Sequence, residues 1–153
     1  MTRIGLVSDT HGLLRPQVLD FLAGSDRIVH AGDIGDEAIL QQLRRIAPVT
    51  AVRGNNDRGP WADRLPEGEL LAVEGIGVFV IHDLAMLAQH AQVRSARVVV
   101  SGHSHKPLVQ ERGGVLFVNP GSAGPRRFKL PIAAGELLVD GDSVSARIME
   151  FAA

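Results

Sequence analysis

Two short motifs place metal-binding side chains close together in the chain. Asp9 and His11 stand two positions apart at the end of an apolar run, and His103 and His105 repeat this spacing after another run. A carboxylate oxygen and an imidazole nitrogen both bind mid-series divalent metals, so each motif can present two ligands to an ion. A single Asp-x-His pair is weak evidence, because a plain turn can contain one. The prediction of a metal site therefore depends on whether other segments end in the same way.

Three further segments end in side chains of the same kinds. Asp33 follows a strand-like run in Gly-Asp, Asn55 stands in Gly-Asn-Asn-Asp, and His82 ends another apolar run. Taken alone, each has a structural explanation as a turn or a core residue. Together they give seven candidate metal ligands: Asp9, His11, Asp33, Asn55, His82, His103 and His105. The other two histidines are interpreted as structural, because His30 lies inside a predicted strand and His90 lies within a predicted helix.

Strands must position these ligands, because the carboxyl ends of neighbouring parallel strands meet at one edge of a sheet. The pattern of apolar residues predicts strands over 4–8, 27–31 and 49–53, and helices over 16–23 and 37–47. Asp36 is the expected N-cap of the second helix. This βα arrangement brings Asp9, Asp33 and Asn55 to the same edge.

The following segments predict antiparallel hairpins, so the sheets should be mixed. Strand pairs are expected over 69–73 and 76–81, 108–111 and 115–118, and 133–139 and 143–149, the last pair closing a second sheet. A strand over 97–100 leads into the His-x-His motif. Leu84 and Leu87 recur at helical spacing after Asp83, which predicts a helix with Asp83 as its N-cap. A loop or short helix around Trp61 is expected over the site.

Composition limits the class of protein. The chain has 153 residues, 45% hydrophobic and 22% charged, which fits one globular domain over residues 1–153. A net charge of −1 and 4% aromatic residues without Tyr disfavour a nucleic-acid polymer as a partner. No Cys occurs, so thiolate ligands are excluded. The absence of a signal-like start and of any apolar run of about 18 residues disfavours a membrane and predicts a soluble, cytoplasmic protein.

The number and kinds of ligand indicate more than one ion. Seven ligands exceed the four of a tetrahedral zinc site. Carboxylate, amide and imidazole donors in that number suit two five- or six-coordinate ions that share a bridging carboxylate. We therefore predict two divalent metal ions per chain. Because the set has no thiol, manganese, iron or zinc is favoured over soft metals. Among divalent ions we expect Mn²⁺ first, with Ni²⁺, Fe²⁺, Zn²⁺ and Mg²⁺ as alternatives.

In their order, the motifs resemble those of the calcineurin-like metallophosphoesterases. They are Asp-x-His at 9–11, Gly-Asp at 32–33, Gly-Asn-Asn-Asp at 54–57, His82, and Gly-His-Ser-His at 102–105. The chain length, the strand order and the Asn-Pro-Gly-Ser segment at 119–122 are most similar to the small prokaryotic phosphodiesterase branch, the YfcE-like proteins. The resemblance covers residues 4–127. It implies an α/β fold, namely a four-layer α/β/β/α sandwich of two mixed β-sheets flanked by helices.

The resemblance also implies a ligand set for each metal and an activity. Asp9, His11, Asp33 and His105 hold the first ion, while Asp33, Asn55, His82 and His103 hold the second, with Asp33 bridging. Asp33, Asn55 and His82 are accordingly the predicted catalytic residues. The predicted function is that of a metal-dependent phosphodiesterase, which hydrolyses a small phosphodiester through a hydroxide bridging the two ions.

Three residues are predicted to contact the substrate. Arg126, next to Arg127, can stabilise charge on the phosphoryl oxygens, with a solvated surface position as the alternative. Ser122 offers a hydroxyl in a turn. Asn56 stands where many members of the family carry a His that can protonate the leaving group, and an amide cannot donate a proton at ordinary pH. We therefore expect faster turnover of diesters with acidic, aryl-like leaving groups than of alkyl monoesters.

Asp83 is a second departure from the family, which usually has Gly after this His. A helix cap is its favoured role, and added charge near the second metal is the alternative.

A non-catalytic metal-binding scaffold of the same fold, as in the retromer coat, is the alternative function, but such a scaffold is expected to have lost ligands that this chain retains. A metal-dependent nuclease is a further alternative, which the net charge of −1 disfavours because such an enzyme would need a basic channel. No motif indicates the natural substrate, and the exposed hairpin faces leave a homo-oligomer open.

Overall fold

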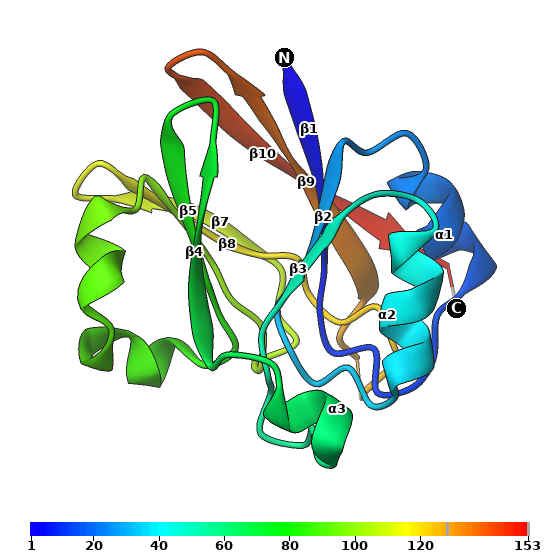
Figure 1. Ribbon diagram of the computed structural model, residues 1–153. Helices are drawn as coiled ribbons and strands as arrows, with labels where there is room; N and C mark the ends of the chain where they lie inside the picture. The colour runs from blue at the N-terminus through cyan, green and yellow to red at the C-terminus, as the bar shows by residue number, and fades with distance from the viewer. Residues whose placement is uncertain (128, 153) are drawn as a thin grey trace.

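Two five-stranded mixed sheets form the centre of the computed structural model, which describes residues 1–127 and 129–152. Figure 1 shows the strands and the helices that flank them. The first sheet contains, in spatial order, β10 (Ser143–Phe151), β9 (Ile132–Asp140), β1 (Thr2–Val7), β2 (Arg27–His30) and β3 (Val49–Ala51). The second contains β4 (Gly68–Val73), β5 (Ile76–Ile81), β6 (Val98–Val100), β8 (Val115–Asn119) and β7 (Leu108–Arg112).

Short helices cover the outer faces of both sheets. They are α1 (Pro16–Leu22), α2 (Glu37–Arg44) and α3 (Pro60–Asp63) beside the first sheet, and the 3₁₀ helices η1 (Leu84–Gln89) and η2 (Ala91–Ser95) beside the second. Pro16 begins α1, where its missing N–H costs nothing. Asp36 caps α2 by accepting the Ala38 N–H at 3.0 Å, as predicted. The layers confirm the expected α/β/β/α sandwich.

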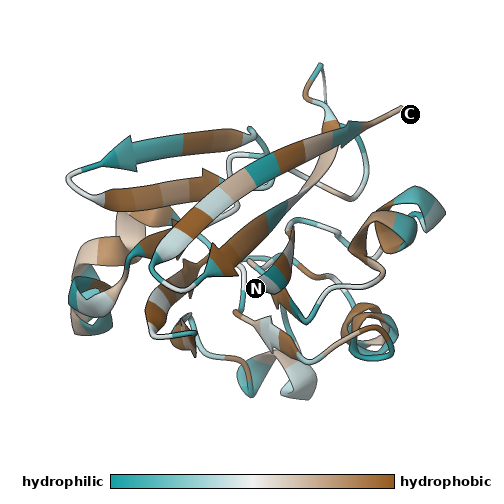
Figure 2. Ribbon diagram, turned by 90° about the horizontal axis from the view of Figure 1, so that it is seen from above, coloured by the Kyte–Doolittle hydropathy of each residue, from teal (hydrophilic) through white to brown (hydrophobic). Residues whose placement is uncertain are grey.

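The main core lies between the two sheets. Ile4, Leu6 and Val29 of the first sheet belong to the same buried cluster as Val80 and Val100 of the second. A second cluster fills the space between the first sheet and α1 and α2. Strands that are buried on both faces consist of nearly continuous apolar residues, whereas β10, at an edge, alternates hydrophobic and hydrophilic residues (Figure 2).

The terminal hairpin joins the first sheet, so the prediction that it closes a second sheet was wrong. β9 pairs antiparallel with β1, with Leu137 opposite Ile4 and Gly135 opposite Leu6. It is buried on both faces, since Ala134 packs toward the helices and Leu137 toward the other sheet. Hairpin turns are local, but the sheet that a hairpin joins depends on the distant strand it pairs with.

The helix predicted after Asp83 is also different. Asp83 is its N-cap, accepting the Ala85 N–H at 3.0 Å, but the segment forms two 3₁₀ helices interrupted at His90. His90 has extended backbone dihedrals, packs its ring on Phe79 and lies 3.0 Å from a carboxylate oxygen of Glu67. The prediction that His90 lies within a helix was therefore wrong. In the described part of the chain, no helix is long and apolar enough to cross a membrane.

Candidate metal centre

The loops after β1 and β2 run side by side and bring two predicted ligands together. The Asp9 N–H donates to the Gly32 carbonyl, and the His11 N–H donates to the Asp33 carbonyl, both at 3.0 Å. The loop after β6 joins them, because the His103 N–H donates to Asp9 Oδ2 at 3.1 Å. Ligands from three separate strands therefore meet at one edge of the sandwich.

Most of the predicted ligands have an unusual backbone conformation. Among the described residues, six non-glycine residues have positive φ: Asp9 (55°), His11 (46°), Asp33 (56°), Glu74 (49°), His103 (71°) and His105 (63°). Glu74 belongs to a hairpin turn, and the other five are candidate ligands. Left-handed backbone is unfavourable for residues with a Cβ and clusters at functional sites. The rest of the fold must hold these loops in place.

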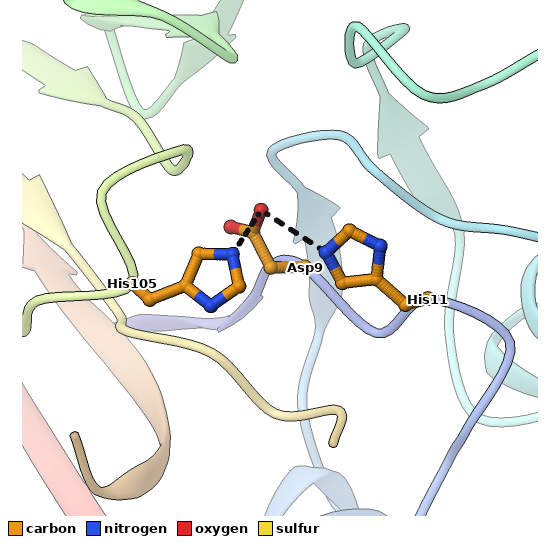
Figure 3. Close-up of side chains that lie close together, drawn as sticks. All are labelled: Asp9, His11 and His105. Atoms are coloured by element: carbon orange, nitrogen blue, oxygen red, sulfur yellow. Dashed lines mark ion pairs between the residues drawn. The ribbon is translucent and has the colours of Figure 1, made fainter. Parts of the chain in front are cut away.

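Asp9 lies at the centre of the cluster. Its Oδ1 is 3.3 Å from His105 Nε2, 3.8 Å from His11 Nε2 and 3.9 Å from His82 Nε2. Figure 3 shows the Asp9 carboxylate between the His11 and His105 rings. Asp33 Oδ2 is 3.3 Å from His82 Nε2 and 3.8 Å from His11 Nε2. Two groups of three ligands result, Asp9 with His11 and His105, and Asp9 with Asp33 and His82.

The buried polar atoms of this cluster fit divalent cations. Asp9 Oδ2 accepts hydrogen bonds from the Ser8 hydroxyl and the His103 N–H, but Oδ1 has no hydrogen-bond partner within the described residues. The Nε2 atoms of His11 and His82 have none there either. His82 Nδ1 donates to the Ala31 carbonyl at 2.7 Å, so its Nε2 lone pair faces the carboxylates. A cation ligated by these atoms compensates for their burial.

Asp33 and His82 shift each other's pKa. Burial works to raise the pKa of Asp33, but the adjacent His82 and the Asn56 N–H outweigh burial and lower that pKa to about 2. Burial works to lower the pKa of His82, and contact with Asp33 and the charge of Asp9 reverse this, so the pKa of His82 is raised. The Asp33 carboxylate is therefore anionic at neutral pH.

Comparison with known proteins shows the family. A model of the calcineurin-like phosphoesterase superfamily domain matches residues 2–142. The chain belongs to this superfamily. The family that the sequence motifs resemble is thus confirmed.

Relatives within the calcineurin-like phosphoesterases carry enzyme names. The chain is 32% identical to a probable metallophosphoesterase of Methanothermobacter thermautotrophicus, over 95% of this chain and 91% of that protein. It is 27% identical to the phosphodiesterase YfcE of Escherichia coli K12, over 95% and 91% of the two chains. The crystal structure of Chaetomium thermophilum Vps29 is similar in fold, with a TM-score of 0.84 and 20% identity, over 97% and 87% of the two chains.

In this calcineurin-like site, Asn55 and His103 lie at the outer side of the cluster. His103 is half exposed, its ring packs edge-on against His82 at 5.2 Å, and its Nε2 is 4.0 Å from Asp83 Oδ2. Asn55 is exposed and lines a cavity together with His82. The favoured role of Asp83 as a cap is confirmed, and its carboxylate also lies beside the candidate ligand His103, so its effect on a second metal stays a prediction.

Three residues that were not predicted as site residues hold the ligand loops together. Asp57 Oδ1 accepts the Ile34 and Gly35 N–H groups at 2.8 and 3.0 Å, and its Oδ2 accepts the Gly54 N–H at 2.9 Å. Asn119 Nδ2 donates to the Gly102 carbonyl at 3.0 Å. The third residue is His30. The available signals were the motifs at 54–57 and 119–122, which contain Asp57 and Asn119, and the presence of a polar residue, His30, in a predicted buried strand.

His30 connects the loops after β1 and β2. Thr10 Oγ1 donates to the Ile34 carbonyl, so His30 Nε2 donates to Thr10 Oγ1 at 3.0 Å, and His30 Nδ1 accepts the Gly32 N–H at 3.1 Å. These two hydrogen bonds assign His30 as a neutral imidazole with its proton on Nε2. Burial is the main reason why the pKa of His30 falls to about 3, and the charges of His82 and His11 contribute.

Two glycines of the motifs are required by close approach. A Cβ on Gly54 would overlap Asp33, and one on Gly102 would overlap the Ser8 hydroxyl. The Gly-Asn and Gly-His motifs of the family therefore have a steric cause, since only glycine lets these loops touch the carboxylate ligands.

The three residues predicted to contact the substrate lie in different surroundings. Ser122 is buried and its hydroxyl donates to the Asp9 carbonyl at 3.1 Å, so it supports the ligand loop from beneath. Asn56 is exposed and donates through Nδ2 to Asp33 Oδ2 at 3.1 Å. Arg126 donates to the Leu130 carbonyl and lines a cavity with Glu150.

Arg127 is the basic residue whose charge reaches the ligands. Burial is the main cause that lowers the pKa of His105, Asp9 opposes it, and the charge of Arg127 lowers it further. The charge of Arg127 therefore acts on the candidate ligand His105, whereas the Arg126 guanidinium contacts the Leu130 carbonyl.

Proposed function

We propose that this protein is a phosphodiesterase that hydrolyses a small phosphodiester with two divalent metal ions, preferably Mn²⁺. The observation that supports this most is the buried Asp9 Oδ1, which lies within 3.9 Å of three imidazole nitrogens in a calcineurin-like phosphoesterase fold. Asp9, His11, Asp33, Asn55, His82, His103 and His105 would hold the ions. When bound, two divalent ions supply a hydroxide nucleophile near neutral pH and offset the charge of the phosphoryl oxygens.

The residues of the chain set the direction and the limits of this chemistry. The Ala31 carbonyl keeps His82 Nε2 directed at the carboxylates, and the Asn56 amide holds Asp33 Oδ2 at 3.1 Å. Asn56 has no titratable proton to give to a leaving oxygen. The enzyme therefore favours esters whose alcohol leaves readily as an anion, such as aryl diesters.

Hydrolysis of two chromogenic esters by metal-stripped protein tests this proposal. Mn²⁺, Ni²⁺, Zn²⁺ or Mg²⁺ is added back, and bis-p-nitrophenyl phosphate is compared with p-nitrophenyl phosphate. We expect metal-dependent hydrolysis that is faster for the diester, and a loss of at least about 100-fold in Asp33→Ala. Asp20→Ala, an exposed change on α1, is the matched control and should keep full activity.

One outcome would favour the non-catalytic scaffold instead. The similarity to Vps29, at 20% identity, shows the fold alone and does not separate the two functions. If the protein binds metal in a calorimetric titration but hydrolyses neither ester with any of the four ions, the enzyme proposal fails. The retained ligand cluster would then serve metal binding or partner recognition.

A further inference from the structure

A cavity of about 290 Å³ opens directly beside the candidate metal ligands. Its lining includes two candidate ligands, the exposed Asn55 and the buried His82, and also Arg53, Glu67, Ile81 and Met86. Because two candidate ligands line it, the cavity adjoins the position where the ions and a bound phosphoryl group would lie. The volume is near the lower end of the range for small-molecule sites, about 300–1,000 Å³, which suits a single ring.

The inner wall of this cavity is apolar. Ile81 is buried at the end of β5, and Met86 is half-buried on η1. The Met86 side chain is unbranched and polarisable, so it adapts to the face or edge of an aromatic ring. Asp83 caps η1 and thereby fixes the turn that carries Met86.

The polar residues of the cavity carry opposite charges and are held in place. The Arg53 N–H donates to the Pro66 carbonyl at 2.8 Å, and its guanidinium reaches the Leu65 carbonyl at 3.4 Å. Glu67 lies 3.0 Å from His90 Nε2. Asp83 also lines the cavity, so its charged side chains are one guanidinium and two carboxylates, and the cavity does not attract a second phosphate. A guanidinium stacks on aromatic faces, and a carboxylate accepts hydrogen bonds from ring N–H or O–H groups.

We propose that this cavity receives one ester group of the phosphodiester substrate, an uncharged aromatic or heteroaromatic ring, which packs against Met86 and Ile81 beside Arg53. The inference rests on the proposed phosphodiesterase function and narrows its substrate class. It makes Met86 a specificity-determining residue that touches the ester group that stays on phosphorus when the leaving alcohol departs.

Binding can be followed at the three methionines of the chain. With isotope-labelled methionine methyl groups and protein loaded with diamagnetic Zn²⁺, diphenyl phosphate is titrated against dimethyl phosphate, which has the same charge but no ring. We expect ring-current shifts at Met86 with diphenyl phosphate only. Met1 and Met149 serve as internal controls, and Met86→Leu assigns the resonance. An unmoved Met86 resonance under saturating diphenyl phosphate overturns the inference.

Kinetics provide the second measurement. Phenyl p-nitrophenyl phosphate and methyl p-nitrophenyl phosphate share a leaving group and differ in the group that remains. We expect wild-type protein to prefer the phenyl ester, and Met86→Ala to reduce this preference about tenfold in kcat/KM. Met149→Ala, on β10, should leave the preference unchanged.

The outcomes separate this inference from the proposed function. A neighbouring cavity of about 370 Å³, lined by His103, Lys106 and Leu108, is the competing position for the ring. If both esters are hydrolysed but the preference changes in Leu108→Ala and not in Met86→Ala, the inference is wrong and the phosphodiesterase function stands. If neither ester is hydrolysed while diphenyl phosphate still shifts Met86, the cavity binds the ring and the proposed catalysis fails.

Discussion

Two side chains at this site each use one polar atom in a hydrogen bond and direct the other polar atom at the ligand cluster. Asp9 engages Oδ2 with Ser8 and His103 and keeps Oδ1 for the cluster, and His82 engages Nδ1 with a carbonyl and keeps Nε2. His30 is different, because both of its nitrogens are bonded within the protein. A fully bonded, buried imidazole resists protonation, which makes the protein sensitive to acid at this residue.

The pH dependence of stability tests the neutral state of His30. Its pKa is about 3 in the folded protein against 6.5 for the free side chain, so the stabilisation is complete above pH 6.5 and is lost as pH falls toward 3. Between those limits His30 lowers the free energy of unfolding by about 1.4 kcal/mol for each unit that the pH falls. Urea titrations at several pH values give the free energy of unfolding at each pH. Its dependence on pH should be shallower in His30→Gln than in the wild-type protein. Equal slopes in the two proteins contradict the assignment.

At the level of elements, the centre depends on connections between loops that follow different strands. Asp57 receives N–H groups from the loop after β2 and from its own loop after β3. Gly54 and Gly102 let these loops approach the carboxylates. Five ligands in left-handed backbone add strain that such connections must offset.

Replacing the Asp57 carboxylate by an amide tests this connection. In Asp57→Asn one acceptor becomes an NH₂ group that faces the Gly54 N–H, so a buried donor loses its partner. We expect a loss of about 1–3 kcal/mol in the free energy of unfolding, together with weaker metal binding by calorimetry. Asp36→Asn is the same chemical change at the cap of α2, where Asn is an equally good N-cap, and should stay near wild type. Unchanged stability and metal affinity in Asp57→Asn would rule out the connection.

In the whole molecule, one buried cluster is shared by both sheets. The cluster contains Ile4 and Leu6 of the first sheet and Val80 and Val100 of the second. Separation of the two sheets would therefore expose these apolar side chains to water. We therefore propose that residues 1–153 form a single domain, as the chain length predicts.

Cooperative unfolding is the expected consequence for the molecule. Trp61 is the only tryptophan and packs against the cluster between the first sheet and its helices, so its fluorescence reports on that side. Circular dichroism reports on both sheets. The two signals should give the same urea midpoint and a single transition. Separate midpoints would show two independent units.

Local features of the fold could be predicted from the residues alone. Ligand types and their motifs, the caps Asp36 and Asp83, and the hairpin turn at Glu74 and Gly75 depend on residues within a few positions of one another. Such features follow from hydrogen-bonding capacity, side-chain period and the conformational freedom of turn residues. They identified the family and predicted the kind of chemistry.

Only the tertiary structure decided how the local pieces combine. It placed the terminal hairpin beside β1, made Asp9 the common member of both ligand groups, and gave Asp57 and His30 their connecting roles. Apart from the pair Asp9 and His11, these contacts join residues that are about 20 to 140 positions apart, and they depend on the order of strands in a sheet. Apolar periodicity repeats within each strand and does not encode that order, which is why the sequence determined the ligands and the folded chain determined their arrangement.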